Sequence, residues 1–189
     1  MADPTTRSPD IAELVAEFRA LAREAQSIFA SRSEDELSTR PANLGWSAAE
    51  CLAHLGLTSR AFLPVVRLAA EQARVRGDLA PGPYRMDFVG RLLKMSLEPP
   101  ARLRVRTRAE FVPRDVGPTA RVLESFLKTQ EEMISAMEAA DGVRLDVVKI
   151  TSPFDARVRY NLFSAFHVLA AHQRRHLLQA QHAAAGSSP

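Results

Sequence analysis

The chain has 189 residues, of which 46% are hydrophobic, and this length supports one sizeable core and predicts a single domain. The formal charge of +3 is too small to indicate a nucleic-acid partner by itself. The single cysteine, Cys51, excludes an internal disulfide and is typical of a reducing compartment. No apolar run reaches the length of a membrane span, and residues 1–10 lack the apolar centre of a signal peptide. We therefore expect a cytoplasmic protein without a membrane partner.

Apolar residues recur at three- and four-residue steps in four long segments, which is the period of helices that bury one face. We expect these helices at about residues 9–31, 47–76, 118–140 and 159–184. A shorter helix is expected at about residues 85–97, within a proline-rich segment. The pattern predicts an all-α protein, a four-helix bundle with a long crossover between its second and third helices. One domain would cover residues 9–184, with flexible ends at residues 1–8 and 185–189.

The second long helix has a strong start signal. Ser47 and Glu50 have the spacing of a capping box, in which each side chain accepts a hydrogen bond from the backbone N–H of the other residue. Trp46 and Cys51 occupy the two positions of a hydrophobic staple around this cap. We therefore expect the helix to begin directly after Ser47.

Arginine alternates with other residues over residues 102–108, and this period of two predicts an extended strap across the bundle. One interpretation is a basic patch for an anionic ligand or a nucleic acid. The other is the solvated face of the crossover. Composition favours the second, because only three of the 25 basic residues are lysines, and this arginine excess is typical of a GC-rich genome.

His172 and His176 are four residues apart, so they lie on one helix face about one turn from each other, as paired metal ligands do. Five histidines produce such a pair by chance too often for the spacing to suffice. Both rings fall on or beside the face expected to be buried, and so does His54 on the second helix; an unpartnered buried imidazole is costly. Taken singly, each is more typical of a hydrogen-bonded core histidine, but together they form a candidate three-histidine site. His167 is expected to face elsewhere, and His182 lies near the end of its helix.

Two segments resemble motifs of the DinB superfamily. Residues 45–55, GWSAAECLAHL, resemble the pattern GWS-x-x-E-x-x-x-HL, and residues 172–179, HQRRHLLQ, resemble the closing H-x-x-x-H-x-x-Q helix. Both have the order and separation found in that family, and the similarity runs over about residues 10–183. The resemblance implies a four-helix bundle that holds a divalent metal, commonly zinc or nickel. By the same resemblance, the ligands are His54, His172 and His176.

Members of this superfamily include transferases that use low-molecular-weight thiols, mycothiol-dependent isomerases, and proteins described as metal-dependent hydrolases. Three neutral imidazoles leave open positions on a divalent ion, where a thiol or a water becomes more acidic. The resemblance therefore implies an enzyme that activates a thiol or water toward a small-molecule substrate, as an S-transferase or a hydrolase. The alternative is a non-catalytic metal-binding or stress-related binding protein, because no residue is an unmistakable general acid or base.

Three residues near the motifs admit two interpretations each. Glu50 precedes His54 by one turn and could be its hydrogen-bond partner or a general base, although the capping box accounts for it equally well. Cys51 could approach the metal or serve the staple. Gln179 could orient a ligand or be an ordinary polar residue of the helix. A homodimer is compatible with a bundle of this kind, but no feature indicates its surface, and no nucleic-acid-binding motif is present.

Overall fold

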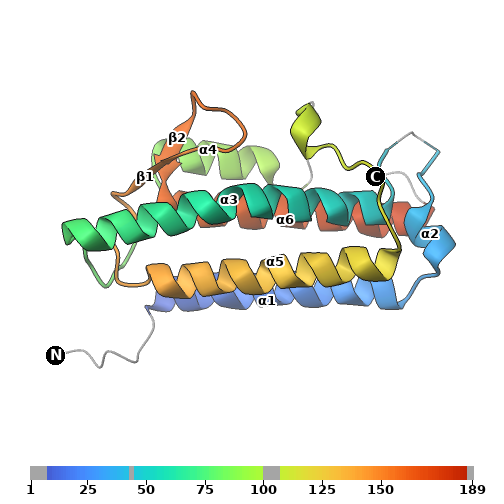
Figure 1. Cartoon of the computed structure of the whole chain (residues 1–189), viewed down its shortest axis with the longest axis horizontal. Coiled ribbons are helices and arrows are strands. Elements are labelled where there is room, and N and C mark those ends of the chain that lie inside the picture. Colours follow the sequence, from blue (N-terminus) through green and yellow to red (C-terminus); the bar gives the residue numbers. More distant parts are fainter. Residues whose placement is uncertain (1–7, 43–44, 100–106, 187–189) are drawn as a thin grey trace.

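The computed structural model describes residues 8–42, 45–99 and 107–186. Four long helices run along the molecule (Figure 1): α1 (Pro9–Ala30), α3 (Ala48–Arg76), α5 (Thr119–Ala140) and α6 (Leu162–Ala184). The shorter elements are α2 (Glu34–Ser38), α4 (Phe88–Leu97), the 3-10 helix η1 (Ala109–Phe111) and the strands β1 (Lys149–Thr151) and β2 (Arg159–Asn161). The all-α bundle predicted from the sequence is confirmed.

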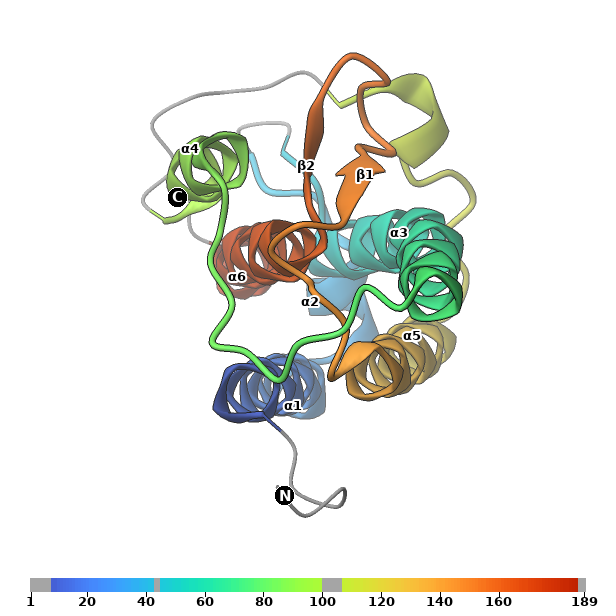
Figure 2. The same ribbon diagram turned by 90° about the vertical axis from the view of Figure 1, so that its left-hand side faces the viewer.

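The long helices form a square in end view, with α1 opposite α3 and α5 opposite α6 (Figure 2). The neighbours α3 and α5 run in the same direction (Figure 1), so the chain must travel back along the bundle between them. Residues 77–118 make this return, which explains the long crossover. Within the crossover, α4 packs against α6 on the outside of the bundle.

Each long helix contributes a phenylalanine to the core, and none of these four side chains is more than 1% exposed: Phe18, Phe62, Phe126 and Phe166. Burying each is worth roughly 1.5–3 kcal/mol. Met133 and Met137 are fully buried, as expected of core filler. The bundle therefore has an apolar core of its own. Among the described residues, no helix combines the length and the apolar character that a membrane span requires.

No helix was expected between residues 31 and 47, but the short helix α2 lies there. Ser33 and Glu36 form a capping box at the start of α2, and Leu37 anchors the helix at 2% exposure. The Glu34 carboxylate then accepts hydrogen bonds from the backbone N–H, at 3.0 Å, and the hydroxyl of Thr119. This small helix thereby supports the start of α5.

Two expected helix starts were three residues too early. Asp87 caps α4, so that helix begins at Phe88 and not at residue 85. Arg159–Asn161 forms the strand β2, which pairs with β1 in antiparallel register, Ile150 opposite Tyr160. The fourth long helix therefore begins at Leu162.

The ends and the strap are only partly described. Residues 100–106 lie outside the described residues, so the extended strap expected at residues 102–108 stays a prediction. At its end, Arg108 donates to the carbonyl of Phe154 at 2.7 Å. Ser8, in the segment expected to be flexible, is 8% exposed and donates to Asp141 through its backbone N–H and its hydroxyl. The single domain at residues 9–184 also stays a prediction.

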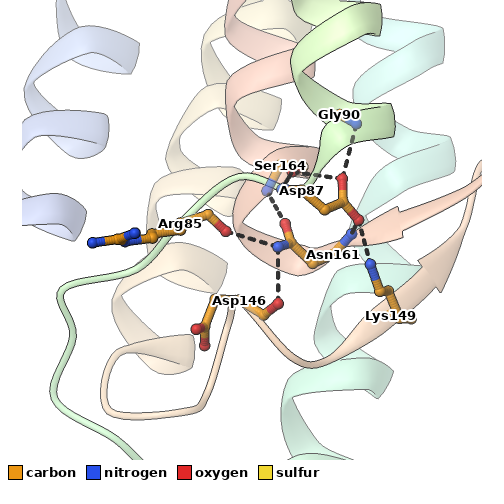
Figure 3. A network of polar contacts seen from close by, with 7 residues as sticks. All are labelled: Arg85, Asp87, Gly90, Asp146, Lys149, Asn161 and Ser164. Atoms are coloured by element: carbon orange, nitrogen blue, oxygen red, sulfur yellow. Dashed lines mark hydrogen bonds and ion pairs between the residues drawn. The ribbon is translucent and has the colours of Figure 1, made fainter.

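Asp87 joins α4 to the start of α6 (Figure 3). Its carboxylate accepts hydrogen bonds from the backbone N–H of Gly90 and of Asn161, both at 2.8 Å, and from the Ser164 hydroxyl at 3.2 Å. Lys149 of β1 completes the set with an ion pair. One partly buried carboxylate thus connects the crossover, the hairpin and the last helix.

Asn161 is the second centre of this network (Figure 3). Its side-chain oxygen accepts from the Ser164 backbone at 2.8 Å and caps α6, and its amide donates to the carbonyls of Arg85 and Asp146 at 2.8 and 2.9 Å. The oxygen and the amide of the buried Asn161 side chain therefore both have hydrogen-bond partners. The start of α6, and with it the rotation of its histidines, is fixed by the segments on either side.

Gly90 is required for this close approach of α4 to α6. A Cβ atom there would lie 2.2 Å from the Cβ and Oγ of Ser164. We expect Gly90→Ala to lower the free energy of unfolding by about 1–3 kcal/mol, because the packed helices must separate. Urea unfolding measures this. The control is Gly56→Ala in α3, where the nearest atoms, at 3.4 Å, belong to the flexible Arg60 side chain; equal losses in both variants would contradict the prediction.

Candidate metal centre

The three histidines singled out in the sequence meet in the structure. His54 comes from α3, and His172 and His176 come from successive turns of α6. One potential ligand nitrogen from each ring lies within 4.8 Å of the others, and the Nε2 atoms of His54 and His172 are 3.2 Å apart. The juxtaposition follows from the antiparallel packing of α3 against α6.

His54 is held by a backbone group of the crossover. Its Nδ1 lies 2.7 Å from the carbonyl oxygen of Phe111, at the end of η1. A carbonyl can only accept, so Nδ1 carries the proton and Nε2 keeps its lone pair. That lone pair is on the side of His172. A carbonyl that orients the far nitrogen in this way is the usual support for a histidine ligand.

All three rings are buried, with exposed fractions of 3% for His54, 7% for His172 and 9% for His176. Burial lowers the pKa of His54, although its bond to Phe111 opposes the shift. Burial, together with the charges of His54 and Arg175, lowers the pKa of His172 to about 3. Burial, together with the charges of His172, His54 and Arg175, lowers the pKa of His176 well below its ordinary value. The rings are therefore neutral at pH 7, the form that binds metal ions.

The donor set fits a divalent ion. Three neutral imidazoles converge, and the Nδ1 atoms of His172 and His176 are buried without hydrogen-bond partners among the described residues. Buried ring nitrogens without hydrogen-bond partners lower the stability of the folded protein unless they bind a ligand. The cluster found among the described residues consists of histidines alone. Imidazole suits borderline ions such as zinc or nickel better than magnesium or calcium.

Aromatic side chains surround the cluster. The Trp46 ring is nearly parallel to His176, with centroids 5.8 Å apart, and it lies 4.8 Å from His54. Phe154, in the loop between β1 and β2, lies 5.8 Å from His172. Trp46 was expected to serve as a staple, and the sequence did not indicate that it would contact two histidines. These rings give the cluster an apolar surrounding.

Glu50 forms the expected capping box. Its carboxylate accepts from the Ser47 backbone N–H at 2.9 Å, and its own N–H donates to the Ser47 hydroxyl at 3.2 Å. Arg40 also forms an ion pair with this carboxylate. Burial raises the pKa of Glu50, but the hydrogen bonds from Arg40 and Ser47 outweigh it and lower the pKa overall. The carboxylate is thus ionised and already engaged.

Cys51 and Gln179 are the two other residues whose roles the sequence left open. Cys51 is 1% exposed, and burial raises its pKa to about 12, so it remains a protonated thiol. The side chain of Gln179 partly opposes the lowering of the pKa of His176. Burial therefore favours the packing interpretation for Cys51, and both interpretations of Gln179 stay open as predictions.

Gln173 of α6 helps to fix the rotation of this helix. Gln173, next to His172, exchanges two side-chain hydrogen bonds of 2.8 and 2.9 Å with Gln130 of α5, across the centre of the bundle. His167 faces away from the cluster, as expected, and its ring meets Phe163 edge-on at 4.6 Å. A rotation of α6 would break the buried glutamine pair, which helps to keep the two candidate ligands directed inward.

Comparison with known families agrees with this geometry. The family model described as the DinB superfamily matches residues 17–180, a range that includes all three histidines. Searches of curated proteins and of solved structures gave no significant match. The match spans most of the chain and includes every long helix at least in part.

Proposed function

The chain belongs to the DinB superfamily, and from that premise we propose that it is a metal-dependent enzyme with His54, His172 and His176 as ligands. The observation that supports this most directly is the convergence of three neutral imidazoles in a buried site. When bound, a zinc or nickel ion would lower the pKa of a low-molecular-weight thiol or of a water molecule at its open position. The proposed activity is S-transfer or hydrolysis on a small-molecule substrate.

The chain's own residues would prepare the site for such chemistry. The Phe111 carbonyl keeps the His54 lone pair directed inward. Trp46 and Phe154 replace water beside the rings, which strengthens electrostatic interactions there. Arg175 brings a positive charge close enough to lower the pKa of His172 and His176. The same charge would favour an anionic thiolate or hydroxide over its protonated form.

The alternative is a non-catalytic metal-binding or stress-related binding protein. Its support is the absence of a carboxylate from the cluster among the described residues, together with the engagement of Glu50 by Ser47 and Arg40. In this case the metal would be held without a general base beside it. Glu50 as a catalytic residue remains a hypothesis on which the enzyme proposal does not depend.

Turnover separates the two proposals. Untagged, metal-loaded protein is assayed with a panel of low-molecular-weight thiols and electrophiles, and with ester and amide substrates. We expect His172→Ala to lower kcat/KM by at least about 100-fold, because one ligand is lost. His167→Ala, on the same helix outside the cluster, should retain activity. Stoichiometric metal without turnover would favour the alternative, and activity that survives His172→Ala would rule out the proposed site.

The other partner expectations remain predictions. Sedimentation velocity at micromolar concentration measures whether the chain forms a homodimer. The expected lack of nucleic-acid binding is checked by titration with duplex DNA. Tight binding that weakens steeply as salt is added would contradict it. The cytoplasmic location is likewise a prediction.

A further inference from the structure

A second candidate site lies outside the histidine cluster. An open cavity of about 870 Å³ is bounded by α3, α5 and the segment that joins η1 to α5, and none of the three histidines lines it. Figure 1 shows this segment passing from η1 to the start of α5. The floor is apolar and includes Leu52, Leu57, Val122 and Phe126. Its volume is in the usual range for small-molecule sites, about 300–1,000 Å³.

Three arginines line this cavity, and each comes from a different segment: Arg60 from α3, Arg121 from α5, and Arg114 from the loop between them. Within the described ranges, none of the three forms an ion pair with a carboxylate. The hydrogen bond that Arg60 forms with a described residue is to the neutral hydroxyl of Ser125, at 3.2 Å. In the described part of the chain, three guanidinium groups therefore line one apolar floor without a carboxylate in ion-pair contact.

The acidic residues of the lining do not cancel this charge. They are Glu110 and Asp115. Glu110 is already paired with Arg108, at 2.7 Å. One carboxylate thus remains against three guanidinium groups, which leaves a positive surplus in a concave region with low-dielectric walls.

The local backbone helps to place Arg60 over the cavity. Gly56 lies one turn before Arg60 on α3, and a Cβ atom on Gly56 would be 3.4 Å from both terminal nitrogens of the guanidinium. The absence of a side chain at Gly56 lets the arginine fold back over this turn. The guanidinium thereby stays beside the apolar floor, although a surface arginine ordinarily extends into water.

We propose that this cavity binds a small organic monocarboxylate with an apolar body. The body would cover the floor between α3 and α5, and the carboxylate would take the place of the missing counter-ion among Arg60, Arg114 and Arg121. Guanidinium groups suit carboxylates because their N–H groups match both oxygens. The site goes beyond the proposed metal-dependent activity and does not require a metal ion.

Calorimetric titration of the full chain with octanoate and with 1-octanol tests this site. Octanoate should bind, and 1-octanol, which has the same chain without the charge, should bind at least about ten-fold more weakly. Arg60→Met and Arg121→Met should each weaken octanoate binding about ten-fold. The control is Arg67→Met, an exposed α3 residue outside the cavity, which should leave the affinity unchanged. Equal affinities for the two probes, or the same affinity in all variants, would overturn the proposal.

Two further measurements keep the test independent of variant folding and of the metal site. In the unsubstituted protein, octanoate should slow amide hydrogen exchange at residues 109–118, and no protection there would count against the cavity. Binding should persist in His172→Ala, so failure of the metal site leaves this result unchanged. Displacement of octanoate by an equal concentration of inorganic phosphate would show that charge alone is recognised, and would exclude the proposed ligand class.

Discussion

Removal of metal by a strong chelator is expected to lower the melting temperature of the metal-loaded protein by about 10 °C and to leave it folded. A ligand that binds only the folded state, present at about 1,000 times its Kd, contributes about 4 kcal/mol, and about 2–4 °C per kcal/mol applies at this chain length. The fold should survive, because the phenylalanine core does not involve the histidines. Differential scanning calorimetry and elemental analysis of the same samples measure the two effects.

The matched variants are His172→Ala and His167→Ala. We expect the first to contain little metal and to melt at the same temperature with and without chelator. The second should keep about one metal ion per chain and the full chelator effect. The unsubstituted protein should be purified without added metal or a histidine tag. If it then holds less than about half an ion per chain and its melting temperature does not change on chelation, the proposed site is wrong.

Acidification of the metal-free protein is expected to destabilise it between pH 6.5 and 5, before most carboxylates take up protons. Burial and the nearby Lys94 lower the pKa of His167 from 6.5 to about 4. Burial is also the largest cause that lowers the pKa of His172, from 6.5 to about 3. Below pH 6.5 the unfolded chain therefore binds protons that the folded chain does not. The contribution of each neutral, buried histidine to the free energy of unfolding is therefore fully present above pH 6.5. It falls by about 1.4 kcal/mol per pH unit as the pH is lowered from 6.5 toward the pKa of that histidine in the folded protein.

His167→Gln isolates one such contribution, since His167 is outside the cluster of three histidines. We expect the variant to lose less stability than the unsubstituted protein when the pH is lowered from 6.5 to 5, by up to about 2 kcal/mol. At pH 8 the pH-dependent part of the difference should vanish. Urea unfolding in the presence of chelator gives both values, and parallel stability curves for the two proteins would show that His167 is not buried in its neutral form.

The sequence predicted those features that depend on local patterns. Ser47 and Glu50 are three residues apart, and their capping box forms as expected. His172 and His176 share a helix face, and the apolar period of both helices placed His54 on the opposing buried face. The bundle and its candidate ligand set therefore followed from spacing and from resemblance to a family.

Features that depend on tertiary contacts could not be predicted in this way. The carbonyl that holds His54 belongs to Phe111, 57 residues away, and a backbone group leaves no trace in a side-chain pattern. The strands β1 and β2 have three residues each, too few to show a period of two. Arg60, Arg114 and Arg121 are unremarkable in sequence, and only the packing of α3 against α5 brings them to one cavity.

The separation of the three proposed ligands along the chain bears on how quickly a bound metal would leave. His54 and His172 are 118 residues apart, whereas His172 and His176 are neighbours on one helix. An unfolded chain could hold an ion with the local pair, but a third ligand would require closure of a very long loop, which is entropically costly. Ligation by all three proposed ligands would therefore require α3 to lie against α6. Metal release should then be no faster than the opening of that helix pair, so the residence time of the ion would report the kinetic stability of the bundle.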